Sequence, residues 1–189
     1  RWLSEQRGSK VHFHHPKRGE KKDLIDMVTA NAREALDMLQ SQEERKNQAI
    51  SRGLWELAHL AGLDEPPRRI EAYDISNIQG SQIVAAMVVM IDGRPANDQY
   101  RRFKIQSVAG APNDYLAMQE VIRRRFTRGI REQQGEQETT SFSDFPDLVL
   151  IDGGKGQLGA ATAVRDELGL MIPMISLAER NEEIYLEGK

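Results

Sequence analysis

Residues 147–152 read DLVLID, an apolar run that ends on Asp152 and is followed at once by Gly153 and Gly154. A short apolar run bounded by turn residues is typical of a strand buried on both faces within a parallel pair. A helical pattern at about 155–168 and a second apolar run, MIPMISLAE, come next. This order of strand, helix and strand predicts an α/β fold.

Upstream of this unit the pattern predicts three strands, a helix and a polar loop. The turn chemistry of DGRPAND favours an antiparallel meander, so the whole sheet is expected to be mixed. Asn113 or Asp114 can cap the helix, and the loop is expected to be mobile because it is polar and poor in aliphatic residues. The predicted ranges are strands at 68–76, 81–92 and 99–106, the helix at 113–129, the loop at 130–146, and a last strand at 182–187.

The N-terminal third differs in periodicity from the rest. Apolar residues recur at helical spacing from Glu20 to about Leu63, and the polar interval QSQEERKNQ is either a solvated helical stretch or a break. VHFHH, near the start, could form an edge strand. Pro66-Pro67 is a natural boundary. The predicted domains are therefore a strand-like piece with a helical linker at 1–66 and an α/β domain at 67–189.

Composition narrows the function classes. The chain has 189 residues and no cysteine, which excludes a disulfide framework or a thiolate metal site and fits a cytoplasmic location. No apolar run approaches the roughly 20 residues that span a bilayer. The net charge of −3 argues against a uniformly basic nucleic-acid binder and leaves room for local basic patches.

Two aspartates carry the chemical argument. Asp74 lies inside the predicted strand EAYDIS, and Asp152 ends LVLID. If a right-handed crossover places these strands side by side, the two carboxylates meet at the centre of the sheet, partly desolvated, and repel each other unless a cation lies between them. Mg²⁺ or Mn²⁺ would resolve this conflict, and one or two such ions can support hydrolysis of a phosphodiester.

Simpler interpretations of the same turn remain open. An aspartate before Gly-Gly is about equally often only a turn or helix N-cap residue. The segment GGKGQ lacks the spacing of a phosphate-binding loop, so nucleotide binding is weakly supported. Lys155 and Gln157 beside this turn can contact a DNA backbone, or they are ordinary residues of a first helical turn.

Basic residues cluster on the predicted third strand and on the helix that follows it. Phosphate contact is the functional interpretation, and a solvated face is the alternative. The three consecutive arginines of RRRF point in different directions around a helix, so at most two can serve one surface. His12, His14 and His15 lack matched metal ligands nearby and fit a surface role. The candidate DNA-contacting residues are Arg101, Arg102, Lys104, Arg124 and Arg125.

Several long motifs occur in order: HPKRGEKKDLIDMVTANAREAL, PPRRIEAYDISNIQG, DYLAMQEVIRRRF, PDLVLIDGGKGQL and EEIYLEGK. With them the chain resembles the UvrC family, the nuclease subunits of bacterial nucleotide excision repair. The resemblance implies a ribonuclease-H-like fold from about residue 68, in which the first and fourth strands are adjacent. It also implies metal-dependent incision of DNA on the 5′ side of a lesion, with damaged double-stranded DNA and a UvrB–DNA complex as partners.

Carried over by motif, the aspartates of YDISN and LIDGG are Asp74 and Asp152, the expected metal-binding acids. Glu120, on the helix after the third strand, is where ribonuclease-H-like enzymes often supply another acid, and a solvated glutamate is the alternative. The chain departs from the usual family pattern at Asn77, where histidine is common. It also departs at Glu179, where lysine is common.

The family completes its active site with a downstream segment rich in aspartate and histidine, followed by a helix-hairpin-helix module. Neither is present in this sequence, so the chain is expected to be a fragment with weak or no activity alone. A catalytically inactive DNA- or protein-binding scaffold on the same fold is therefore the main alternative. A nucleotide-binding α/β enzyme is a distant third.

Overall fold

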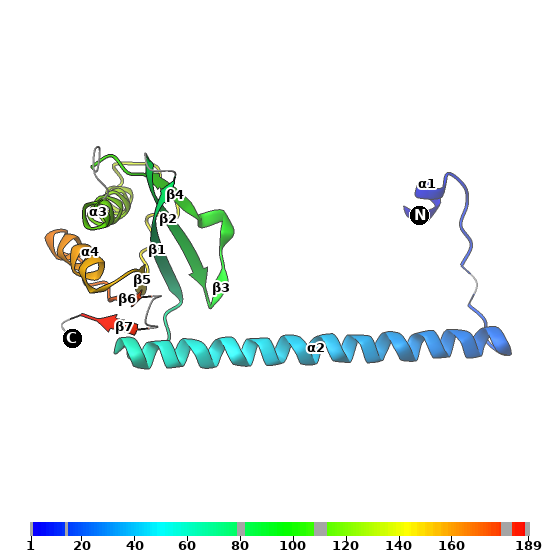
Figure 1. Cartoon of the computed structure of the whole chain (residues 1–189). Coiled ribbons are helices and arrows are strands. Elements are labelled where there is room, and N and C mark those ends of the chain that lie inside the picture. The colour runs from blue at the N-terminus through cyan, green and yellow to red at the C-terminus, as the bar shows by residue number, and fades with distance from the viewer. Residues whose placement is uncertain (1, 14, 79–81, 108–112, 179–182, 188–189) are drawn as a thin grey trace. The chain divides into compact units, whose positions relative to one another are not determined.

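The computed structural model describes residues 2–13, 15–78, 82–107, 113–178 and 183–187. Two compact units divide the chain, residues 1–49 and 50–189. The first contains α1 (Trp2–Arg7) and most of α2 (Glu20–Ala61), and the second contains the end of α2 and the described strands (Figure 1). The predicted domain boundary after residue 66 stays a prediction. No helix in the described ranges is both long enough and apolar enough to cross a membrane.

The long helix α2 resolves the question that the polar interval left open. QSQEERKNQ lies inside one continuous helix, since Gln, Glu, Arg and Lys are strong helix formers. The helix stops where Gly62 adopts a positive φ of 70° and the Leu63 N–H donates to the Ala58 carbonyl. The predicted edge strand at VHFHH is wrong for residues 11–13 and 15, which form no strand. His14 lies outside the described residues.

Within the described residues, seven strands form one mixed sheet in the second unit. Its order is β3-β2-β1-β5-β6-β7, and β4 also pairs with β2. Only β1–β5 and β5–β6 are parallel pairs. The bounds are β1 Arg69–Ile78, β2 Gln82–Ile91, β3 Arg94–Pro95, β4 Arg101–Lys104, β5 Leu148–Asp152, β6 Met174–Ala178 and β7 Glu183–Leu186.

This topology confirms the predicted fold class, including the adjacency of the first strand and the strand after the helix. The predicted strand at 99–106 is shortened to β4, whereas β3 and most of a 3-10 turn (Asn97–Gln99) lie in the DGRPAND segment that was predicted to be a turn. Asp92 and Gly93 make the turn between β2 and β3, with φ values of 49° and 70°. A side chain on Gly93 would also collide with Ile50 of α2. Both the positive φ and the close contact therefore favour glycine at this position.

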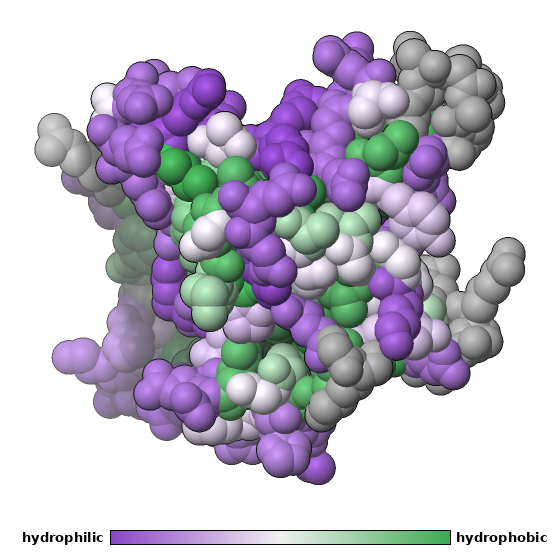
Figure 2. Space-filling view, turned by 90° about the vertical axis from the view of Figure 1, so that its left-hand side faces the viewer, coloured by the Kyte–Doolittle hydropathy of each residue, from purple (hydrophilic) through white to green (hydrophobic). Residues whose placement is uncertain are grey.

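Two helices cover one face of the sheet. α3 (Asp114–Gln133) and α4 (Lys155–Glu167) lie side by side on it (Figure 1). The main core fills the space between, with members such as Tyr73, Val121, Phe126, Val149 and Leu158. Figure 2 views this side, where hydrophilic residues dominate and apolar residues reach the surface in several places between them. The other face carries a smaller core, in which Leu54 and Leu57 of α2 pack on Ile70, Leu148 and Ile175.

Candidate active site

Asp74 and Asp152 lie opposite each other on neighbouring parallel strands. The β1–β5 ladder pairs Ile70 with Leu148 at its start and Asp74 with Asp152 at its end. Register partners in a sheet project to the same face, and here that face is the one opposite α3 and α4, because Ile70 and Leu148 belong to the smaller core. The structure therefore brings the two predicted acids together.

The surroundings of the two carboxylates are more open than the sequence argument assumed. Asp74 is partly buried, whereas Asp152 is exposed at the strand end. The Ser76 hydroxyl, two residues along the same face of β1, donates to Asp74 Oδ2 at 2.6 Å. Asp74 is thus partly desolvated, as predicted, whereas Asp152 is not, and solvent screening weakens the repulsion between the two carboxylates.

The row of residues that contains the two acids continues across the sheet. Ala86 of β2 faces Asp74, and Arg102 of β4 faces Ala86. Lys104 faces Val84, which in turn faces Ser76. Arg102 and Lys104 are exposed, and at a strand spacing of about 4.8 Å they lie two strands, roughly 10 Å, from β1. Two cations thus share a face with the two acids.

Asp147 fixes the register of this ladder at its other end. Its Oδ2 accepts hydrogen bonds from the Arg68 and Arg69 backbone N–H groups, at 2.9 and 2.8 Å. A slip of one residue would break both bonds and would turn one of the two acids to the opposite face. Asp147 and Arg69, each five residues before one of the two acids, therefore help to set the alignment of Asp74 with Asp152.

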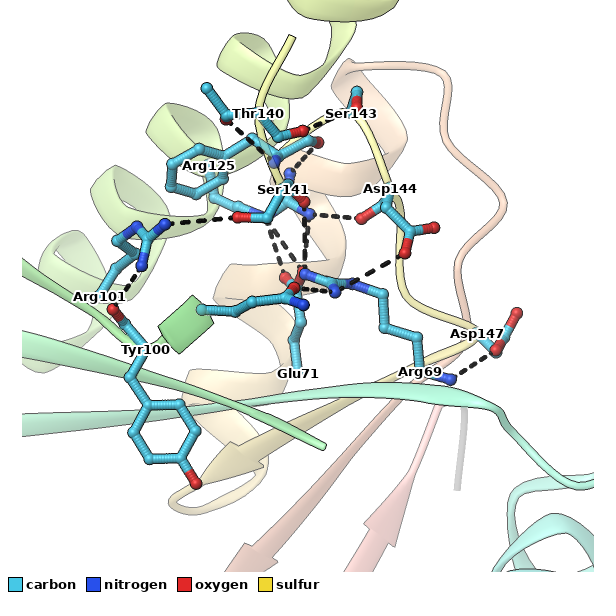
Figure 3. Close-up of polar contacts among 12 residues, drawn as sticks. Arg69, Glu71, Tyr100, Arg101, Arg125, Thr140, Ser141, Ser143, Asp144 and Asp147 are labelled. Carbon is cyan, nitrogen blue, oxygen red and sulfur yellow. Dashed lines mark hydrogen bonds and ion pairs between the residues drawn. The ribbon is translucent and has the colours of Figure 1, made fainter. Parts of the chain in front are cut away.

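Beside Asp147, a buried ionic cluster joins β1, α3 and the loop that leads into β5 (Figure 3). Arg69, Glu71 and Arg125 are almost completely buried, and Glu71 accepts hydrogen bonds from both arginines, at 2.8 Å and 2.7 Å, and from the Tyr73 hydroxyl at 2.6 Å. Burial raises the pKa of Tyr73, and the neighbouring Glu71 carboxylate raises it further. The tyrosine stays protonated and donates to Glu71.

This cluster also holds the segment predicted to be a mobile loop. Residues 130–133 continue α3, and the following segment is packed. The Arg125 guanidinium donates to the carbonyl oxygens of Phe142 and Asp144 at 2.7 and 3.0 Å. Phe142 is buried in the core, and Phe145 packs edge-on against Phe126. The segment is therefore packed at residues 140–146, whereas residues 134–139 are exposed, and its mobility stays a prediction.

Sequence reasoning missed Glu71 and Arg69, although a signal was present. Successive residues of a strand point to opposite faces, so Glu71 and Asp74, three residues apart, lie on opposite faces of β1. One of these two charges therefore had to lie on the face that the helices cover. A fully buried charge is rare without partners. Those partners are Arg69, on β1 itself, and Arg125, in the arginine-rich segment of α3.

The Glu120 side chain binds backbone N–H groups and a neighbouring arginine of α3. Its Oε2 accepts from the backbone N–H groups of Gln106 and Ser107 at 2.9 and 2.8 Å, and its Oε1 pairs with Arg124. Partial burial opposes ionisation, but these N–H donors hold the pKa of Glu120 below its ordinary value. It forms no metal-binding group with the two aspartates in the described ranges.

The predicted basic residues divide into two sets. Arg125 is buried, so its assignment to a DNA-binding surface is wrong. Arg101 donates to the Asp98 and Tyr100 carbonyls and lies over Phe142, and Arg124 donates to the Lys104 carbonyl and lies over Phe103. Arg102 and Lys104 alone combine exposure with a place on the face of the two acids.

Lys155 and Gln157 open α4 directly after the Asp152 turn. Lys155 is exposed, whereas the Gln157 side chain accepts from the Gly154 N–H at 3.1 Å and so caps the helix. A cavity of about 470 Å³ lies here, lined by Asn113, Asp114, Tyr115, Gly154, Gly156 and Gln157. Both helices that cover the sheet begin at this cavity.

The donor set fits a hard divalent cation only in part. Two carboxylates on one face match the way Mg²⁺ is usually held, by one or two carboxylates with water and phosphate oxygens completing its shell. Across the described ranges no group of three or more His, Asp or Glu residues is arranged for a metal. The side chain of Asn77 and the whole of Glu179 lie outside the described residues.

Comparison with known proteins gives matches over almost the whole chain. The family model for the UvrC RNAse H endonuclease domain matches residues 58–189, and the one for the UvrC Ribonuclease H-like domain matches residues 1–39. The UvrABC system protein C of Gloeobacter violaceus is 47% identical over all of this chain and 29% of its own length. That of Clostridium perfringens is 46% identical over 95% of the chain and 30% of its own length. The chain thus spans under a third of these relatives.

Solved structures share a weaker likeness. Human ENDOV gives a TM-score of 0.41 at 13% identity, over 59% of this chain and 46% of that protein. Endonuclease V of Ciona intestinalis, in complex with a 24mer DNA containing an inosine, gives a TM-score of 0.38 at 17% identity, over 58% and 45%.

Proposed function

Because the chain belongs to the UvrC RNAse H endonuclease domain family, we propose that it forms part of the DNA-cutting site of an excision-repair nuclease. In the whole protein this site would make the 5′ incision beside a lesion, on damaged DNA presented by a UvrB–DNA complex in the cytoplasm. The observation that carries the proposal is the in-register pairing of Asp74 with Asp152 on one face of the sheet.

Asp74 and Asp152 would hold one or two Mg²⁺ or Mn²⁺ ions, which supply Lewis acidity to the phosphodiester when bound. The Ser76 hydroxyl fixes one oxygen of Asp74, which leaves the other for the ion. Both acids sit on adjacent parallel strands of the sheet centre, so the rigid backbone sets their separation. Their role is to bind the ion and to orient it toward the strand being cut.

Arg102 and Lys104 would hold the phosphate backbone on the same face, with Lys155 at the turn after Asp152. Such contacts position DNA without reading its sequence, in keeping with substrate choice by a damage-recognition partner. Arg101, Arg124 and Arg125 support the fold, and Glu120 supports the start of α3; none of them is included in the proposed site.

The test is 5′ incision by the whole protein carrying Asp74→Asn or Asp152→Asn. The control is Glu167→Gln, at an exposed position of α4. We expect either aspartate change to abolish incision while DNA binding is kept. Titration of Mn²⁺ into this chain gives a second readout, in which weak binding should be lost with either change. Retained incision would exclude the assigned roles, and Mn²⁺ binding indifferent to Asp74 would favour the inactive scaffold.

A further inference from the structure

The N-terminal half of α2 carries a continuous apolar stripe that nothing in its own unit covers. We define the α2 stripe as Leu24, Ile25, Val28, Ala35, Leu36 and Leu39. At 100° per residue these positions fall within about 120° of the helix circumference. The large members are 38–63% exposed, and Pro16 is the one buried residue among those described up to Ala49. This unit has no core of its own.

The family match identifies what should cover the stripe. Residues 1–39, which include all of it, match a ribonuclease-H-like domain, and the curated relatives are about three times the length of this chain. Such a domain packs its helices on a sheet, as α3 and α4 do here, and 39 residues are far too few to build one. The helix is therefore one piece of a second domain whose sheet lies elsewhere in the polypeptide.

The shape of the stripe favours packing on such a domain over pairing with a second copy of the chain. A two-stranded coiled coil needs a narrow seam of apolar residues repeated over three or four heptads. The α2 stripe is wider than such a seam, and the heptad positions after Leu39 fall on Gln42 and Lys46. A broad aliphatic face that ends after about four turns suits packing on a sheet.

We infer that the α2 stripe is the contact face for the apolar sheet of a second ribonuclease-H-like domain of the same polypeptide. The long helix then links two domains of one fold class. Its first turns would belong to the core of the second domain, and its last turns, at Leu54 and Leu57, belong to the smaller core described above. This inference does not depend on the proposed nuclease site.

Hydrogen exchange of the α2 amides tests it, in the whole protein and in the 189-residue chain. We expect the amides of residues 24–39 to exchange at least about tenfold more slowly in the whole protein. Val28→Asp and Leu39→Asp should remove that protection. The matched changes Ala30→Asp and Ser41→Asp, exposed on the opposite side of the helix, should leave it intact.

Two outcomes would overturn the inference. One is equal exchange of these amides in the whole protein and in the 189-residue chain. The other is protection in the 189-residue chain that rises with concentration together with a dimer mass in light scattering, because the occupant would then be a second copy. Incision activity plays no part in this readout, so a failure here leaves the proposed function untouched.

Discussion

Glu71 is the residue on which the buried cluster depends, because two buried guanidinium groups share its carboxylate. Glu71→Gln would leave Arg125 without its counter-charge and Arg69 with the longer contact to Asp144, at 3.8 Å. Removing one member of a buried ion pair typically costs about 3–5 kcal/mol. We expect urea unfolding to show a loss of that size.

Glu167→Gln is the matched control for this change, since it breaks the exposed Arg123–Glu167 pair. Exposed pairs contribute at most about 1 kcal/mol. Similar losses for the two variants would show that the Glu71 cluster stabilises the fold no more than a surface contact does.

Glu120 gives a prediction about pH. Its folded-state pKa is lowered, so its contribution to stability is complete above the unfolded-state value of about 4.3 and is lost as the pH falls through the folded-state pKa. Glu120→Gln should cost about 1.5–3 kcal/mol at pH 7, the range for hydrogen bonds to charged groups.

Urea midpoints of the wild type and Glu120→Gln, measured at pH 7 and at pH 3, give the check. The difference between them should be smaller at pH 3. A difference that is unchanged or larger in acid would contradict the assigned hydrogen bonds.

At the scale of elements, Gly129 marks the closest approach of the 134–147 segment to α3. A Cβ there would lie 2.4 Å from the Phe142 carbonyl oxygen and 2.8 Å from Arg125 Nη1. Gly129→Ala should therefore destabilise the fold by about 1–3 kcal/mol through overpacking. Thermal unfolding measures the effect.

The control is Gly159→Ala in α4, where a Cβ would meet nothing within 4 Å. Alanine inside a helix is favoured over glycine by roughly 0.5–1 kcal/mol, so this change should raise the melting temperature. A melting temperature that Gly129→Ala leaves unchanged or raises would refute the tight contact at Gly129.

Most strands and helices of the second unit followed from apolar periodicity, whereas the meeting of Asp74 and Asp152 was predicted from an assumed crossover and from the family resemblance. The packed segment before β5 did not follow from periodicity, because its anchors are aromatic rings and an arginine separated by polar residues, a pattern without a period. The inward orientation of Arg125 was not predicted either. Its helical position was a missed signal, because Arg125 lies four residues after Val121 and three after Ile122, on the apolar face of α3.

At the scale of the whole molecule, the net charge of −3 makes DNA binding depend on where cations are placed. If Arg102 and Lys104 contact phosphates, replacing either with alanine should lower the slope of log K against log salt by about 0.9. Arg123→Ala, an exposed change on α3, should leave the slope unchanged. Binding to a short duplex across a salt series distinguishes these results. Equal slopes for all three variants would show that Arg102 and Lys104 do not contact the DNA phosphates.

The sheet separates the proposed site from α3 and α4: Asp74, Asp152, Arg102 and Lys104 lie on one face, and these two helices pack on the other. A label on α3 or α4 would therefore leave the proposed site uncovered. This sequence contains no cysteine, so Glu167→Cys on α4 would create a single attachment point for a dye or a surface tether. Immobilised in that way, the molecule would present the proposed site outward to DNA in solution.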